Sequence, residues 1–331
     1  MPDSTPAYPS AEWDSAAPEA LSLDSARLES AAAILGRPQS NALAFLVVRG
    51  GKIAFERYFG GGQADVRLHL FSVTKSILSA LIGIALEEGR LPSVEQPVAD
   101  FFPELDHQPG SPWSQLTLRH LLSMTSGLLW PLSHHAAEPM VARLRLAPDW
   151  GRFILDVPVR REQIGTFHYC SASSHLLSVI LSRAAGQNAC AYAAARLFAP
   201  LGINPPSCGQ EWENDPQGCS LGGWGLHLTA RELARFGWLY LCGGSWQGAQ
   251  LVPRSWVQAS TRLADGYPSG YGYHWWLRRG KGQAVFAAIG RGGQYLFCVP
   301  NLDLAAVILS EPANRWPDRW EILDLLVAAS H

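Results

Sequence analysis

The sequence predicts an α/β (α+β) fold in which both chain ends build one antiparallel sheet flanked by helices, with an all-helical part inserted between them. Two apolar runs joined at Gly50-Gly51 indicate a β-hairpin near the N-terminus, helical segments and loops fill the middle, and four short strand-like runs precede a last helix. The 331 residues, 47% of them hydrophobic, suffice for a sizeable core.

Each early element has a local signal. Residues 1–20 are rich in Pro, Ser and Ala, so we expect a loose arm, followed by a helix over 24–36. The hairpin strands are expected at 43–49 and 52–58. From Val73 to Leu86 nearly every residue is apolar or small, and a helix that is apolar all round is a buried helix.

The later elements follow from periodicity and from Gly, Pro and Asn punctuation. Helices are expected over 116–128, 171–186, 189–202 and 229–244, the last with Thr229 as N-cap. Strands are expected over 271–279, 283–290, 293–300 and 303–311, and a closing helix over 318–330. The predicted domains are an arm at 1–20, a sheet domain at 21–104 and 216–331, and a helical domain at 105–215.

Charge and hydropathy exclude several classes of partner. The net charge of −2, without a clustered basic run, argues against nucleic acid and anionic membranes as partners. No apolar run reaches the ~18 residues that a membrane-spanning helix needs. The first residues carry acids and lack both the basic and the apolar region of a secretory signal, so a cytoplasmic location is expected.

The cysteines are scattered and form no C-x-x-C pair, which argues against zinc. They are expected to be buried free thiols, with a Cys208–Cys219 bond across a loop as the alternative. The adjacent His134 and His135 lack an H-E-x-x-H pattern, so no metal or organic cofactor is expected.

The stretch Ser72-Val73-Thr74-Lys75 carries the first chemical signal. The chain has only three lysines, Lys52, Lys75 and Lys281, and Lys75 lies inside the apolar helix. Residues three apart share one helix face, burial lowers the pKa of a lysine, and such a lysine can deprotonate a serine. Because a chance S-x-x-K is common, this pattern alone leaves the catalytic and the accidental interpretations balanced.

Two further stretches favour catalysis. Tyr169 and Ser171 lie at a loop-to-helix junction, where a tyrosine can share a proton with the serine or lysine, although a core tyrosine is the simpler reading. Gly290, Gly292 and Gly293 lie by a strand, where glycine marks either the close approach of another backbone or ligand, or a bulge.

Taken together, the motifs resemble the superfamily of class C β-lactamases, penicillin-recognising DD-peptidases and their esterase relatives. The matching stretches, in the family's order over roughly residues 25–330, are "FSVTKS", "LTLRHLLSMTSGL", "GTFHYCSASSHLLSVI", "LHLTARELARFG", "YGYHWWL" and "GRGGQYLFCVP". The resemblance implies an α/β domain built from both chain ends and a helical domain between them, with the active site in the cleft between the two.

The resemblance also implies roles for individual residues. Ser72 would be the nucleophile that forms the acyl-enzyme, Lys75 its general base and Tyr169 the proton shuttle to the leaving group. Arg291-Gly292-Gly293 would take the place of the family's Lys-Thr-Gly or His-Thr-Gly strand. The oxyanion hole would use the backbone N–H groups of Ser72 and Gln294.

Departures from the family pattern bear on the substrate. Ser171 replaces the asparagine of Tyr-x-Asn and cannot offer its amide pair, while Arg291 and Gly292 replace Lys or His and Thr. These features are similar to family VIII carboxylesterases and 6-aminohexanoate-dimer hydrolases. The expected substrate-binding residues are Ser171, Arg291, Gly293, Gln294 and Trp224.

The expected function is therefore a serine hydrolase for small carboxylic esters or amides. Trp130, Trp150, Trp224 and Trp276 lie near family loops that line the cleft, and an aromatic wall would suit an apolar acyl or alcohol group. The alternatives are a β-lactamase or D-alanyl peptidase and, from a different class, a non-catalytic binding protein on the same fold. The expected partner is a small molecule, and a homodimer is compatible with the sequence.

Overall fold

The structure is a computed structural model, and it describes residues 7–10, 12–105, 108, 110–133, 138–262, 270–313 and 317–330. The pair His134 and His135, considered above as metal ligands, lies outside these residues.

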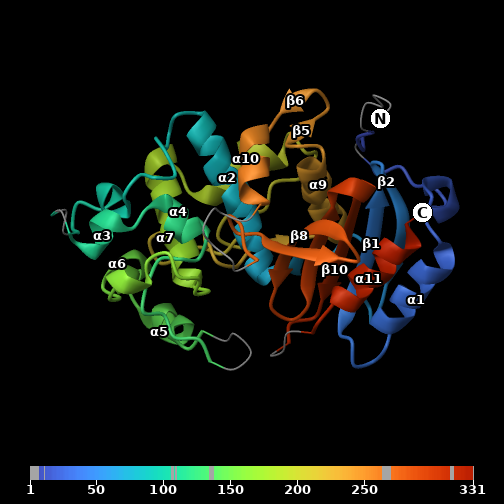
Figure 1. Ribbon diagram of the computed structural model, residues 1–331, viewed down its shortest axis with the longest axis horizontal. Coiled ribbons are helices and arrows are strands. Elements are labelled where there is room, and N and C mark those ends of the chain that lie inside the picture. The colour runs from blue at the N-terminus through green and yellow to red at the C-terminus, as the bar shows by residue number, and fades with distance from the viewer. Residues whose placement is uncertain are drawn as a thin grey trace.

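A six-stranded sheet forms the frame of the molecule, and all neighbouring strands in it are antiparallel. In spatial order the strands are β2 (Lys52–Tyr58), β1 (Ala42–Arg49), β10 (Leu304–Ser310), β9 (Gln294–Val299), β8 (Gln283–Gly290) and β7 (Trp276–Gly280). On β1, Val47 lies opposite Phe55 on one side and Ala306 on the other. The predicted sheet from both chain ends is confirmed (Figure 1).

Helices account for most of the remaining structure. They are α1 (Ser25–Leu35), α2 (Thr74–Glu87), α3 (Pro112–Gln115), α4 (Leu118–Leu122), α5 (Met140–Leu146), α6 (Trp150–Leu155), α7 (Ser171–Ala185), α8 (Ala189–Ala193), α9 (Ala230–Leu241), α10 (Arg254–Ser260) and α11 (Trp320–Ala329). Two-residue strands β3 (Leu68–His69), β4 (His227–Leu228), β5 (Ser245–Trp246) and β6 (Ala249–Gln250) complete the set. Figure 1 shows α3 to α7 gathered at the end of the molecule away from the sheet.

Both faces of the sheet are buried, which explains the continuous apolar run of β1. Successive strand side chains point to opposite faces. Phe45 and Val47 belong to the cluster with α1 and α11, whereas Leu46 and Val48 belong to the cluster that includes α2 and α9. The core therefore has two layers, one on each side of the sheet.

Helix α2 is buried as predicted. Every residue from Thr74 to Ala85 is buried, and the helix packs against α7 and α10. Gly83 makes the second contact possible, because a Cβ there would lie 2.3 Å from the ring of Trp256. Figure 1 shows α2 between the sheet and the helices α3 to α7, and the helix ends at the C-cap Glu88.

Two predicted helices are shorter in the structure. The helix expected over 116–128 is reduced to α4, and the one expected over 189–202 is α8 followed by a π-helical turn, Ala194–Phe198. Helix α9 begins as predicted, because the Thr229 hydroxyl accepts from the Glu232 N–H while the Glu232 carboxylate accepts from the Thr229 N–H.

The described part of the N-terminal arm is attached rather than loose. The indole of Trp238 in α9 donates to the Ala7 carbonyl (2.8 Å), and the Arg235 guanidinium donates to the Ser10 carbonyl (2.9 Å). The arm also passes the hairpin turn, where a Cβ on Gly51 would lie 2.1 Å from the Ala7 oxygen. The composition of this segment gave no sign of these contacts, because they use backbone carbonyls.

The cysteine prediction was wrong in one respect. Cys190 in α8 and Cys208 form a disulfide, while Cys219, the alternative partner expected for Cys208, is a half-buried free thiol. The fold decides this pairing, because it brings residues 18 apart in sequence to a Cα separation of 5.7 Å. Among the helices of the described residues, none has the length and apolar character required to cross a membrane.

Candidate active site

Ser72 lies in a one-turn 3-10 helix, Phe71–Val73, that leads directly into α2. Phe71 has a φ of +48°, a conformation that is uncommon for a bulky residue and costs it energy. The turn is supported by His69, whose Nδ1 accepts from the Phe71 N–H (2.9 Å) and whose Nε2 lies 3.3 Å from a carboxylate oxygen of Glu213. Ser72 itself is half-buried.

Lys75 lies one turn further on and is only 1% exposed. Its Nζ donates to Ser72 Oγ (3.0 Å), to Ser171 Oγ (2.9 Å) and to the Gly223 carbonyl (2.7 Å). These three acceptors match the three N–H groups of an ammonium. The spacing of Ser72 and Lys75 therefore produces the contact expected from the sequence.

Burial lowers the pKa of Lys75 from 10.5 to about 8, and the nearby Glu138 carboxylate opposes this shift. Because the charged form is disfavoured in a low-dielectric site, a substantial fraction of the amine is neutral under mildly alkaline conditions. A neutral lysine within hydrogen-bond distance of a serine hydroxyl can accept its proton.

Tyr169 is adjacent to both groups. Lys75 Nζ lies 5.0 Å from the centre of the Tyr169 ring, and Trp276 stacks on the same ring at 5.9 Å. Burial and then the Glu138 carboxylate raise the pKa of the Tyr169 hydroxyl, while a hydrogen bond with the Ser72 side chain acts in the opposite direction. Tyr169 is therefore a neutral phenol that can hold or pass a proton at Ser72.

Ser171 is the first residue of α7, and it faces the network around Lys75. It is 2% exposed, and its Oγ contacts Lys75 and donates to Glu138 Oε1 at 2.6 Å. A direct contact between Ser171 and a substrate stays a prediction.

Glu138 is the residue that sequence reasoning missed. Its Oε2 accepts from the Ser171 N–H (2.7 Å) and from the Trp130 indole (2.6 Å), in addition to the Ser171 hydroxyl bond to Oε1. A carboxylate at the start of a helix is favourable, because the first N–H groups have no partner within the helix. Glu138 lies in a loop without a motif, so only the three-dimensional structure reveals it.

The hairpin between β8 and β9 approaches the Ser72 segment from the sheet. A Cβ on Gly290, the last residue of β8, would lie 2.3 Å from the Leu70 carbonyl oxygen, which explains why this strand ends in glycine. Gly290 pairs with Gln294, whose buried side chain bonds to the Ser310 backbone in β10. The sequence-based interpretation of this glycine as a close approach of another backbone is confirmed.

The other predicted residues of this hairpin lie in its turn. Gly292 and Gly293 have φ of +83° and +101°, values that favour glycine, and their carbonyls accept from Asn41 and from Ser310. Arg291 is half-buried in the same turn. Contacts of Arg291, Gly293 and Gln294 with a substrate, and the oxyanion role of the Gln294 N–H, stay predictions.

Trp224 follows Gly223, whose carbonyl accepts from Lys75. The Trp224 ring lies 6.0 Å from that of Trp150, and the Arg145 guanidinium lies 5.7 Å above it. The loop before β4 therefore carries both a Lys75 acceptor and the predicted aromatic residue.

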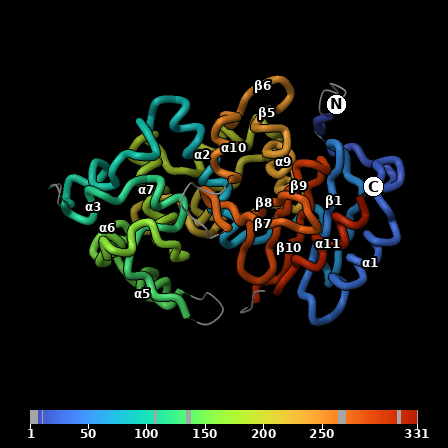
Figure 2. The backbone as a smooth tube through the Cα atoms, in the orientation of Figure 1, coloured from blue at the N-terminus to red at the C-terminus, as the bar shows by residue number. Residues whose placement is uncertain are grey.

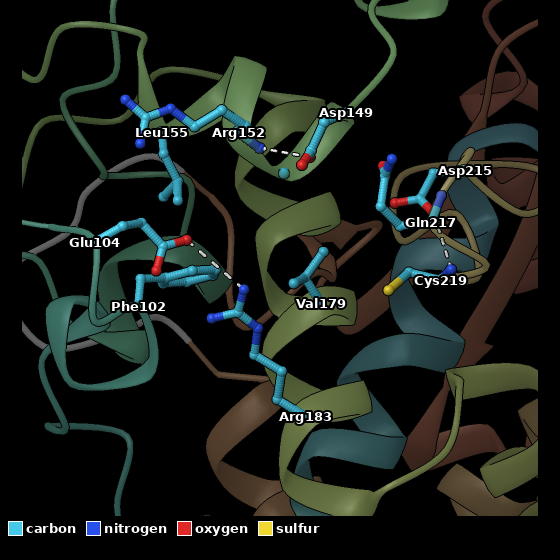
Figure 3. A pocket seen from close by; sticks show the side chains of 11 residues that line it. Phe102, Glu104, Asp149, Arg152, Leu155, Val179, Arg183, Asp215, Gln217 and Cys219 are labelled. Atoms are coloured by element: carbon cyan, nitrogen blue, oxygen red, sulfur yellow. Dashed lines mark hydrogen bonds and ion pairs between the residues drawn. The ribbon is translucent and has the colours of Figure 1, made fainter.

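A separate cavity of about 390 Å³ lies in the helical region, beside α6 and α7 (Figure 3). None of the predicted site residues lines it. Charged side chains along it already have partners: Arg183 lies 3.7 Å from Glu104, Asp149 accepts from the backbone N–H of Arg152, and the Arg152 guanidinium pairs with Asp156 at 2.7 Å. We therefore place the candidate active site at Ser72 and not in this cavity.

Comparisons with known proteins identify the family to which this sequence is similar. A sequence model of the Beta-lactamase family matches residues 30–326. The 6-aminohexanoate-dimer hydrolase of Paenarthrobacter ureafaciens is 29% identical over 297 residues, which is 83% of this chain and 73% of that protein.

Solved structures show the same fold at lower identity. The octameric penicillin-binding protein homologue from Pyrococcus abyssi aligns with a TM-score of 0.71 at 18% identity, over 93% of this chain and 78% of that one. The penicillin-binding protein from Bacillus halodurans aligns with a TM-score of 0.67 at 17% identity, over 92% and 98%.

Proposed function

The chain belongs to the β-lactamase family, and from this premise we propose that it is a serine hydrolase that cleaves small carboxylic esters or amides through an acyl-enzyme on Ser72. The observation that carries the proposal is the contact of 3.0 Å between Ser72 Oγ and the buried Lys75 Nζ, whose pKa is lowered to about 8. The relationship to a 6-aminohexanoate-dimer hydrolase supports amide or ester cleavage as the reaction class.

In the proposed first step, Ser72 Oγ attacks the substrate carbonyl carbon while its proton passes to neutral Lys75. The carbonyl oxygen becomes an oxyanion, which backbone N–H groups at Ser72 and, on the hairpin, at Gln294 would stabilise. The N-terminus of α2 contributes positive potential at the same place. The carbon–heteroatom bond then breaks, and the leaving group receives a proton through Tyr169.

In the second step, water attacks the acyl carbon and passes a proton to Lys75, the same base as in the first step. The bond between Ser72 Oγ and the acyl carbon breaks, and Ser72 recovers its proton as the acid leaves. The proton transfers in both steps would use only Ser72, Lys75 and Tyr169, whereas stabilisation of the oxyanion would also need Gln294.

The contacts of Ser171 favour esters and simple amides over β-lactams. Its Oγ has a single proton, which is donated to Glu138, and its lone pairs face Lys75. A side chain engaged in this way offers a substrate neither the donor nor the acceptor of an asparagine amide.

Replacement of the nucleophile tests the proposal. Ser72→Ala should abolish turnover of p-nitrophenyl acetate and butyrate, because no acyl-enzyme can form. Ser79→Ala on the same helix is the matched control, since the Ser79 hydroxyl is buried without a hydrogen-bond partner among the described residues. Retained activity in Ser72→Ala alongside normal folding would refute the assignment.

A substrate panel and a covalent probe separate the alternatives. We would compare nitrophenyl esters of several lengths, a linear 6-aminohexanoate dimer and nitrocefin. Fast nitrocefin turnover with poor ester turnover would favour a β-lactamase. A fluorophosphonate should add one adduct, at Ser72, and its absence from folded protein would favour a non-catalytic binding protein.

A further inference from the structure

We propose that Glu138 is a positioning residue that sets the direction of the hydrogen bonds around Lys75, so that Ser72 is the hydroxyl from which the neutral amine takes its proton. The inference rests on the proposed roles of Ser72 and Lys75. It concerns a residue that would not itself touch the substrate carbonyl.

The first step concerns the direction of the bonds at Glu138. The Ser171 N–H and the Trp130 indole can only donate, so Glu138 Oε2 accepts from both, at 2.7 and 2.6 Å. Oε1 accepts from the Ser171 hydroxyl at 2.6 Å. The side chain is therefore held as an acceptor by three donors, two of which cannot reverse.

The second step concerns the hydroxyl of Ser171. A serine hydroxyl has one proton, and here Glu138 accepts it. Toward Lys75, at 2.9 Å, Ser171 Oγ can then only accept. Glu138 thereby prevents Ser171 from giving a proton to the lysine.

The third step concerns the neutral amine, which has two N–H groups and one lone pair. The Gly223 carbonyl has no proton to give, and the Ser171 proton is engaged, so these two take the N–H groups. The lone pair then faces the third neighbour, Ser72 Oγ, at 3.0 Å. The arrangement thus selects the nucleophile as the proton donor among the three groups bonded to Lys75.

The groups around Lys75 determine how a loss of the Glu138 charge would change the pH dependence of activity. Burial raises the pKa of the Cys170 thiol to about 12, burial also raises the pKa of the Tyr169 phenol, and burial lowers the pKa of His274 to about 3, so all three are neutral near pH 8. Among the described groups that act on Lys75, the Glu138 carboxylate raises the pKa of Lys75.

The test is Glu138→Gln. The amide oxygen must stay with the two obligate donors, Ser171 N–H and Trp130, so the amide NH₂ points at Ser171 Oγ and frees its proton to compete for Lys75. We expect kcat for p-nitrophenyl butyrate to fall roughly tenfold to a hundredfold. This loss is no larger than the roughly hundredfold that is the smallest typical contribution of general acid–base catalysis. We also expect the acid limb of the pH–rate profile to move to lower pH, because the charge that raises the pKa of Lys75 is gone. Structural damage alone would lower kcat without that shift.

Two further variants keep the inference falsifiable. Glu138→Gln combined with Ser171→Ala removes the competing hydroxyl, so it should recover part of the kcat lost in Glu138→Gln. Should Glu138→Gln fail to fold, Ser171→Ala alone should lower kcat by less than tenfold and leave the acid limb in place. Glu162→Gln, at an exposed glutamate, is the matched control and should behave like the wild type.

The outcomes separate this inference from the proposed function. An unshifted acid limb in Glu138→Gln, or a double variant slower than the single one, would overturn the role of Glu138 while Ser72 labelling by fluorophosphonate persists. Activity that survives Ser72→Ala would instead remove the proposed function on which the inference stands.

Discussion

At the scale of single residues, Lys75 shows how the site trades stability for reactivity. Burying a lysine disfavours its charged form, and the decrease in pKa from 10.5 to about 8 measures that cost. At about 1.4 kcal/mol per pKa unit, the free energy of unfolding at neutral pH is reduced on the order of 3 kcal/mol. The same burial supplies the neutral amine that the proposed reaction requires.

This cost should be visible in the pH dependence of stability. The folded-state pKa of Lys75 lies below that of the unfolded chain, so the unfolded chain binds the proton more tightly between pH 8 and 10.5. The destabilisation caused by burying Lys75 is therefore fully present below about pH 8, and it disappears as the pH rises toward 10.5. Urea unfolding of wild type and Lys75→Met should show a rise in the wild type across this window, on the order of 3 kcal/mol, that the variant lacks. Parallel curves would contradict the lowered pKa.

At the scale of elements, the site depends on the contact between the end of β8 and the segment before Ser72. Gly290 has no side chain, which lets its backbone approach the Leu70 carbonyl, and Phe71 follows with a strained φ of +48°. Lys75 and Ser171, by contrast, are presented by α2 and α7, which pack against each other. The position of the nucleophile relative to its base is therefore set from the sheet as well as from the helices.

Gly290→Ala tests this dependence. The added methyl group would lie 2.3 Å from the Leu70 oxygen, so the strand or the Ser72 turn must move. A displacement of about 1 Å can reduce catalysis about a hundredfold, and we expect a loss of that order in kcat on nitrophenyl esters. Gly151→Ala is the control, because its nearest contact would be an ordinary 3.5 Å. Equal activity in the two variants would show that this approach does not position Ser72.

At the scale of the whole molecule, the disulfide links α8 to the segment that carries Gly223, whose carbonyl accepts from Lys75. Cys208 begins a long connection that includes Gly223 and ends at β4, and the bond to Cys190 fixes its start to α8. Further along, Arg67 forms an ion pair of 2.9 Å with Glu211 in the same connection. Because reducing compartments keep most thiols reduced, a disulfide is unusual for the cytoplasmic location expected from the sequence.

Removal of the disulfide should weaken the folded state. A bond that closes a loop of this size contributes about 3 kcal/mol, so Cys190→Ser should lower the free energy of unfolding by that order. Cys219→Ser, at a free thiol, is the matched control. Guanidinium unfolding with and without reductant measures both effects, and a wild type insensitive to reductant would contradict a bond that matters for stability.

The sequence predicted those features whose causes are local. The apolar run of α2, the serine and lysine one turn apart, the Thr229 cap and the short apolar runs of the strands depend on neighbours within a few residues. Glu138 and the Cys190–Cys208 bond could not be predicted, because each depends on segments that only the folded chain brings together. The division into a sheet domain and a helical domain, with boundaries at 104/105 and 215/216, stays a prediction.

The order of the strands also has a consequence for how the chain is made. β1 pairs with β10, and Figure 2 shows α1 and α11 on the same side of the molecule. Leu23 pairs with Ser330, and the Asp24 N–H donates to the Ala329 carbonyl (2.9 Å). A ribosome therefore releases the apolar strand β1 long before its partner exists. Until the last segment emerges, one edge and one face of that strand stay uncovered, as in other nascent chains that chaperones protect from aggregation. Activity should thus appear only after β10 and α11 have emerged.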